Sequence, residues 1–79
     1  MSNKLFAERL NQALDDIGAP ERFEERTDVL SKLIKVPRFK AEALLNGAFV
    51  PDAPLLALLA QEFEISEAWL LGRGGGHGL

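Results

Sequence analysis

The sequence predicts an all-α domain of five short helices, and three observations support this fold class. Apolar residues recur at the three- and four-residue spacing of helices, and no stretch alternates between apolar and polar residues as a strand does. Helix-capping residues, glycine and proline divide the chain into segments of helical length. The chain has 79 residues, 47% of them hydrophobic, which suits one folded domain rather than a disordered segment.

The first helix is expected to run from Ser2, which can cap it, to about Ile17. Its buried stripe follows helical spacing and consists of Phe6, Leu10, Ala13, Leu14 and Ile17. Gly18 can adopt the left-handed conformation that ends a helix. Residues 19–26 are then expected to form a charged connection, which Phe23 anchors to the core.

A short second helix is expected to follow Thr27, because threonine is a good N-cap and Asp28 would lie at the positive end of the helix dipole. Its apolar face is formed by Val29, Leu30, Leu33 and Ile34. Residues 35–37 interrupt the helical spacing and predict a tight turn.

The third helix is expected to begin at Pro37 or Arg38, since proline is tolerated in a first helical turn, and to end at Asn46 and Gly47. Its inner face consists of Ala41, Leu44 and Leu45. Asp52 is expected to cap a fourth helix. The core residues of that helix are Leu55, Leu56, Leu58, Leu59 and Phe63.

Ser66 is expected to cap a fifth helix that contains Trp69, Leu70 and Leu71. The glycine-rich residues 73–79 are expected to form a flexible tail, so that the folded domain spans residues 1–72.

One stretch of the chain has the opposite charge from the rest. Residues 29–41 contain no acidic residue and four basic ones, Lys32, Lys35, Arg38 and Lys40. Because the whole chain has a net charge of −3 and this stretch carries +4, the remainder carries −7. This local reversal in the sign of the charge suggests that one surface binds an anion, while the remaining surface repels it.

The second and third helices are joined by so short a connection that they predict a helix-turn-helix. Leu30 and Ile34 share one face, Ala41 and Leu44 are three residues apart, and Val36 bridges them from the turn. This packing leaves the outer face of the third helix free. A helix about 10–12 Å across with its side chains fits the major groove of B-DNA, which is roughly 12 Å wide.

From Phe6 to Arg73, the order and spacing of these motifs resemble the Cro/repressor-like (XRE-type) helix-turn-helix family, in particular its short phage and bacterial regulators. The resemblance is carried by residues 27–47, Pro51, Leu55, Leu59, Ala60, Phe63, Ile65, Ser66 and residues 69–72. It implies a compact, five-helix, lambda-repressor-like DNA-binding domain. It also implies a cytoplasmic transcriptional repressor that binds a palindromic operator in double-stranded DNA as a homodimer.

Four residues depart from the pattern of that family. Ser31 and Lys35 stand where alanine and glycine are usual, Pro37 replaces the serine or threonine that caps the third helix, and Leu44 replaces a tryptophan. A lysine in a left-handed turn position has an energetic cost.

The resemblance also implies which side chains touch DNA. Base edges would be contacted by Arg38, Phe39, Glu42 and Ala43, and helical spacing agrees, because these four share the face opposite Ala41 and Leu44. Phosphates would be contacted by Thr27, Lys32, Lys35, Lys40 and Asn46. Dimer contacts would come from Val50, Leu70 and Leu71.

Other interpretations of the same residues stay open at this point. The basic stretch could be the solvated rim of a helical bundle, Phe39 could pack rather than read bases, and Glu42 could pair with Arg38. A different class of function is a protein-interaction module, such as an antitoxin or an accessory subunit. Phe39, Phe49 and Val50 would then hold a partner protein.

The residues do not predict an enzyme. The chain has no cysteine and no tyrosine, and its one histidine, His77, lies in the tail without a second metal ligand nearby in sequence. The paired carboxylates at 15–16 and 24–25 are expected to face solvent. We therefore expect no catalysis, cofactor, bound metal or small-molecule substrate, and no membrane span.

Overall fold

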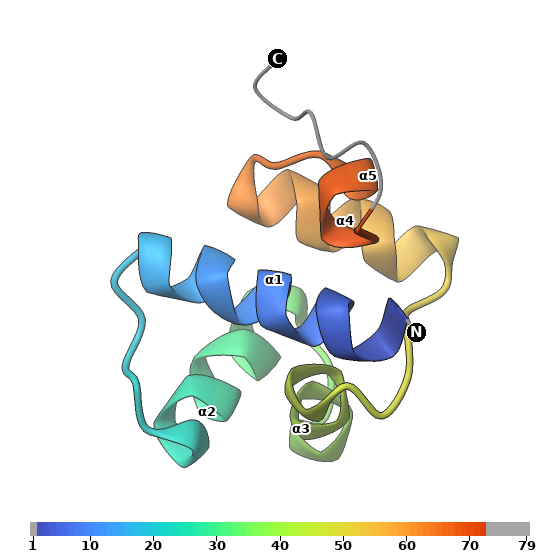
Figure 1. Cartoon of the computed structure of the whole chain (residues 1–79). Coiled ribbons are helices and arrows are strands. Elements are labelled where there is room, and N and C mark those ends of the chain that lie inside the picture. The colour runs from blue at the N-terminus through green and yellow to red at the C-terminus, as the bar shows by residue number, and fades with distance from the viewer. Residues whose placement is uncertain (1, 73–79) are drawn as a thin grey trace.

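The computed structural model describes residues 2–72, which form five α-helices and no strand, as the sequence predicts (Figure 1). The helices are α1 (Ser2–Asp16), α2 (Phe23–Ile34), α3 (Arg38–Asn46), α4 (Ala53–Phe63) and α5 (Glu67–Leu70). The predicted tail, residues 73–79 with His77, lies outside the described residues.

The five helices enclose one hydrophobic core. In Figure 1, α1 crosses the middle of the molecule, with α4 and α5 on one side and α2 and α3 on the other. Each helix contributes at least one side chain with an exposure of 2% or less: Phe6, Leu10, Leu14, Leu30, Ile34, Leu44, Leu59 and Leu70. Burying a large apolar side chain stabilises the fold by about 1.5–3 kcal/mol, so these contacts fix how the helices pack.

Several predicted helix ends are confirmed. The Asp52 carboxylate accepts a hydrogen bond from the Leu55 amide (3.1 Å), and the Ser66 hydroxyl accepts one from the Trp69 amide (3.2 Å). Helix α3 begins at Arg38 after Pro37, which gives it no side-chain cap. These ends are local features of the sequence, because a cap acts on amides within its own first turn.

Gly47 ends α3 in the left-handed conformation, with φ of 77°. A Cβ atom at this position would lie 3.1 Å from the Asn3 carbonyl oxygen and 3.4 Å from the Ala7 Cβ atom. Glycine therefore provides both the left-handed turn and the close approach of this turn to α1.

The predicted start of α2 is wrong. The helix begins at Phe23 with Arg22 as its N-cap, so Thr27 lies inside the helix. Thr27 is fully buried, and its hydroxyl donates a hydrogen bond to the Phe23 carbonyl oxygen at 2.8 Å. An N-cap stabilises a helix by only about 1 kcal/mol. The additional turn brings Thr27 into the core and buries Arg26, and this burial stabilises the fold by more than the cap would.

Two residues that the sequence assigned to the core are at the surface. Helix α1 ends at Asp16, so Ile17 lies beyond it and is 53% exposed. Phe23 is the first residue of α2 rather than a loop anchor, and it is 42% exposed.

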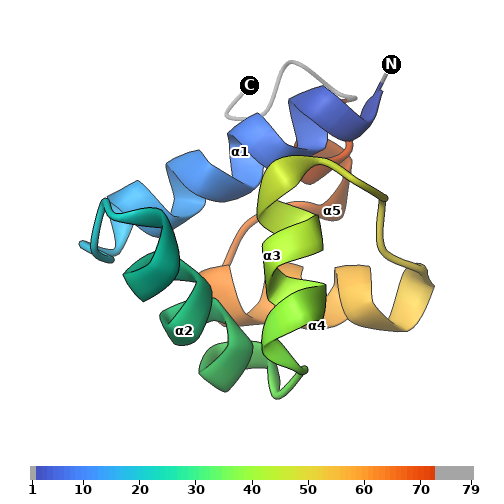
Figure 2. The same ribbon diagram turned by 90° about the horizontal axis from the view of Figure 1, so that it is seen from below.

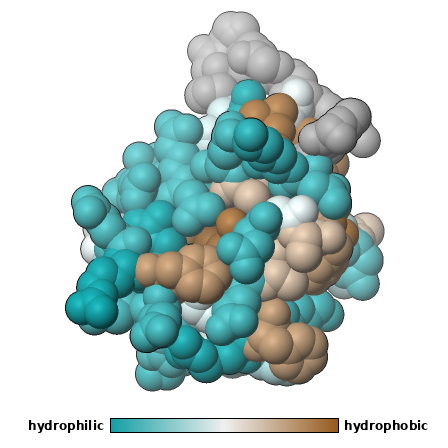
Figure 3. Space-filling view, turned by 60° about the horizontal axis from the view of Figure 1, so that its bottom comes forward, coloured by the Kyte–Doolittle hydropathy of each residue, from teal (hydrophilic) through white to brown (hydrophobic). Residues whose placement is uncertain are grey.

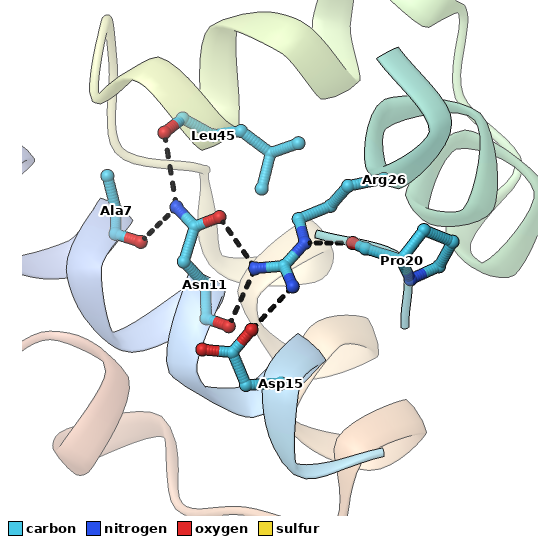
Figure 4. A network of polar contacts seen from close by, with 6 residues as sticks. All are labelled: Ala7, Asn11, Asp15, Pro20, Arg26 and Leu45. Atoms are coloured by element: carbon cyan, nitrogen blue, oxygen red, sulfur yellow. Dashed lines mark hydrogen bonds and ion pairs between the residues drawn. The ribbon is translucent and has the colours of Figure 1, made fainter. Parts of the chain in front are cut away.

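A buried arginine holds the first three helices together (Figure 4). Arg26 is 5% exposed, and its Nε donates to the Pro20 carbonyl oxygen at 2.8 Å. Its Nη1 donates to the backbone and side-chain oxygens of Asn11, both at 3.1 Å, and its Nη2 to the Asp15 carboxylate. The Asn11 amide in turn donates to the Leu45 carbonyl oxygen of α3 at 3.4 Å. The network therefore links α1, α2 and the end of α3.

We expect Arg26→Ala to lower the free energy of unfolding by about 2–3 kcal/mol, because it removes a buried side chain and leaves the partly buried oxygens of Asn11 and Pro20 without their donor. Urea unfolding followed by circular dichroism measures this change. Arg22→Ala is the matched control: Arg22 is exposed, and this variant should stay within about 0.5 kcal/mol of the parent. A loss below about 1 kcal/mol for Arg26→Ala would contradict a structural role.

We also expect Lys35→Gly to raise the free energy of unfolding by about 0.5–1 kcal/mol. Lys35 has the left-handed φ of 58° that the sequence suggested, and glycine adopts it without steric cost. The same exchange inside α2, Lys32→Gly, should lower stability by about 1 kcal/mol. Thermal unfolding distinguishes the two variants, and equal signs would refute the explanation.

Candidate nucleic-acid interface

Helix α3 lies at one end of the molecule, where its outer face is open to solvent. Residues 35–37 connect it to α2, and Val36 packs against the core and donates its amide hydrogen to the Ser31 carbonyl oxygen at 3.1 Å. Figure 2 shows α3 in front of the rest of the molecule, with α2 beside it. The inner face of α3, as predicted, is formed by the buried residues Ala41, Leu44 and Leu45.

The four residues predicted to contact bases lie on the side of α3 away from the core. Phe39 is the most exposed large hydrophobic residue among those that the structure describes, at 72%, so it does not pack in the core. The Arg38 side chain is 47% exposed, and Glu42 and Ala43 are partly exposed. The face that the resemblance implied, and with which helical spacing agrees, therefore points away from the core, because the buried positions 41, 44 and 45 determine which positions point outward.

Four of the five predicted phosphate contacts are accessible. Lys32, Lys35 and Asn46 are exposed, and Lys40 is partly exposed. The prediction for Thr27 is wrong, because its fully buried hydroxyl already donates to Phe23 and cannot reach a phosphate. The error follows from the misplaced start of α2.

The charge around α3 differs from what the sequence suggested. Arg38 pairs with Asp28 of α2, with 3.5 Å between Nη1 and Oδ1, and Asp28 also pairs with Lys32, with 3.0 Å between Oδ2 and Nζ. The alternative in which Arg38 pairs with Glu42 is wrong, because within residues 2–72 Arg38 has its ion pair with Asp28. The Asp28–Lys32 pair has the i, i+4 spacing visible in the sequence, whereas the Asp28–Arg38 pair depends on the packing of α2 against α3.

The additional turn of α2 places two more acidic residues, Glu24 and Glu25, at the hollow that Arg38 borders. A shallow hollow of about 470 Å³ lies beside the start of α3, lined by Pro20, Glu24, Glu25, Asp28, Val29 and Arg38. The negative charges of the three acidic residues that border this hollow lower the local potential and oppose a nearby phosphate. Figure 3, in which this end of the molecule turns forward, shows a mainly hydrophilic surface from which apolar side chains emerge.

A second hollow, of about 590 Å³, lies between α1 and the segment joining α4 to α5. Arg9 borders it, lies 5.0 Å from the centre of the Trp69 ring, and donates to the Trp69 carbonyl oxygen at 2.7 Å. The arginine thus fastens α5 to α1. In the part of the chain that the structure describes, no three histidine, cysteine or carboxylate residues gather as metal ligands, and no helix is long and apolar enough to span a membrane.

Comparison of the chain with protein-family models, with curated proteins and with solved structures found no match in any of the three. The similarity to Cro/repressor-like regulators therefore stays a prediction from the motifs and their spacing. Any functional assignment depends on the geometry and charge of the α3 face.

Proposed function

We propose that the protein is a sequence-specific regulator of transcription, acting as a repressor, that reads the major groove of double-stranded DNA with α3. The observation that supports this most is the outer face of α3. It presents Arg38 and Phe39 to solvent at one end of an otherwise acidic molecule, with exposed Lys32 and Lys35 nearby. A helix of about 10–12 Å diameter with its side chains suits a groove of roughly 12 Å width.

Each side chain on this face would make a particular kind of contact with DNA. The Arg38 guanidinium would donate two hydrogen bonds to guanine O6 and N7, a contact that discriminates by about 1–3 kcal/mol. Phe39 and Ala43 would contact thymine methyl groups, and the Glu42 carboxylate would accept from cytosine N4. Lys32, Lys35, Lys40 and Asn46 would contact phosphates and hold the helix in register.

A homodimer on a palindromic operator would compensate for the small number of basic residues on one protomer. Two copies would place their α3 helices about 34 Å apart, one DNA turn, and would double the number of phosphate contacts. Leu70 is fully buried in the single chain and so is unsuitable as a dimer contact. Val50 and Leu71 are half-buried and remain candidates. Such a regulator would act in the cytoplasm of a bacterial cell.

One observation favours a second candidate, a protein-interaction module that acts as an antitoxin or accessory subunit. Phe39 exposes 72% of its surface, and Arg38 lies against α2 beside Glu24, Glu25 and Asp28. An exposed aromatic ring beside paired charges also suits a protein partner. Titration with a duplex at rising ionic strength tests the first candidate, because affinity that depends on neutralised phosphates falls steeply with salt.

We expect Arg38→Ala and Lys40→Ala to affect duplex binding differently. Arg38→Ala should relax base preference at one position by about 1–3 kcal/mol, whereas Lys40→Ala should weaken all duplexes alike and reduce the salt slope by about one charge. Selection of bound fragments from a random DNA pool, followed by titrations at several salt concentrations, measures both effects. If both variants bind every duplex as the parent does, the proposed function is refuted.

A further inference from the structure

The terminal nitrogens of Arg38 both face α2 in the free protein. Nη1 lies 3.5 Å from Oδ1 of Asp28, and Nη2 donates to the Glu24 carbonyl oxygen at 3.4 Å. The two side chains of the ion pair are partly exposed, Arg38 at 47% and Asp28 at 45%. The arginine is therefore held by a loose surface pair and not by a buried one.

A bidentate contact with guanine uses N–H groups from the same end of the guanidinium. Arg38 must then rotate away from Asp28 before it can read a base, so DNA and α2 compete for one side chain. An exposed ion pair changes an equilibrium constant by at most about fivefold. A bidentate guanine contact is worth roughly five- to 150-fold, whereas a single exposed phosphate contact is comparable to the pair itself.

We propose that Asp28 is a specificity-determining residue, which keeps Arg38 on α2 when the duplex has a random sequence and releases it to guanine at the operator. This inference rests on the function proposed above and adds a source of its selectivity. Asp28 also engages Lys32 at 3.0 Å, so one carboxylate restrains two of the four cations in residues 29–41. When these cations are held by Asp28, the protein binds the phosphates of every duplex less tightly. The guanine contact then restores affinity only at the operator.

The neighbouring acidic residue Glu25 provides a matched control. Glu25 lines the same hollow as Asp28, but within the described residues Asp28 is the carboxylate that pairs with Arg38. Glu25→Gln therefore removes one negative charge from the same place and leaves the Arg38 pair intact. Asp28→Asn removes the same charge and also the pair. A difference between these variants isolates the pair from the general electrostatic field.

The test measures binding of the parent, Asp28→Asn and Glu25→Gln to a selected operator and to a random duplex at 50 and 200 mM salt. We expect Asp28→Asn to bind the random duplex about three- to tenfold more tightly than the parent does, and the operator less than about threefold more tightly. The ratio of operator to random affinity should therefore fall. The affinity of Asp28→Asn for the random duplex should also drop about threefold more than that of the parent between the two salt concentrations. Glu25→Gln should leave the selectivity unchanged.

A double-mutant cycle assigns the effect to Arg38 itself. In the Arg38→Ala background, Asp28→Asn should leave the ratio of operator to random affinity unchanged, because no guanidinium is left to release. The inference fails, and the proposed function stands, if Asp28→Asn preserves the selectivity of the parent. It also fails if Glu25→Gln lowers selectivity equally, or if the loss persists without Arg38. If the parent and Asp28→Asn bind no duplex at either salt concentration, the proposed function fails and this inference with it.

Discussion

The burial of Arg26 is the constraint on which the arrangement of the first three helices depends. A buried guanidinium is tolerated only when its donors find acceptors, and here Pro20, Asn11 and Asp15 supply them. Those acceptors belong to α1 and to the segment before α2, so α2 can take one position relative to α1. Asn11 extends the constraint to the last turn of α3 through the Leu45 carbonyl oxygen. The direction in which the outer face of α3 points therefore follows from a polar network and not from apolar packing alone.

The same constraint determines the charge at the proposed DNA surface. With Arg26 in the core, α2 begins at Phe23, and its first turn brings Glu24 and Glu25 into the hollow beside Arg38. The +4 charge of residues 29–41 is thus partly offset in three dimensions. Under the proposed function, an acidic molecule with restrained cations would bind random DNA weakly, and its selectivity would come from contacts with bases more than from attraction to phosphates.

Much of the fold was predictable because its signals are local. Asp52, Ser66 and Gly47 end or begin helices through contacts within one turn, and helical spacing identified the outer face of α3. The start of α2 was not predictable in this way, because the capping preference of Thr27 competes with burial that only the assembled helices provide. The Asp28–Arg38 pair was missed for the same reason, since it joins residues on two helices whose packing the sequence alone does not determine.

The proposed function requires the surface formed by α3 and the end of α2 to contact double-stranded DNA. The most direct measurement follows backbone amide and arginine side-chain NMR signals of the labelled protein as a selected duplex is added. We expect the largest changes within residues 32–46, including the Nε signal of Arg38, and little change at Arg9 beside α5. Changes centred on the hollow between α1 and the segment joining α4 to α5, or no change with any duplex, would contradict this function.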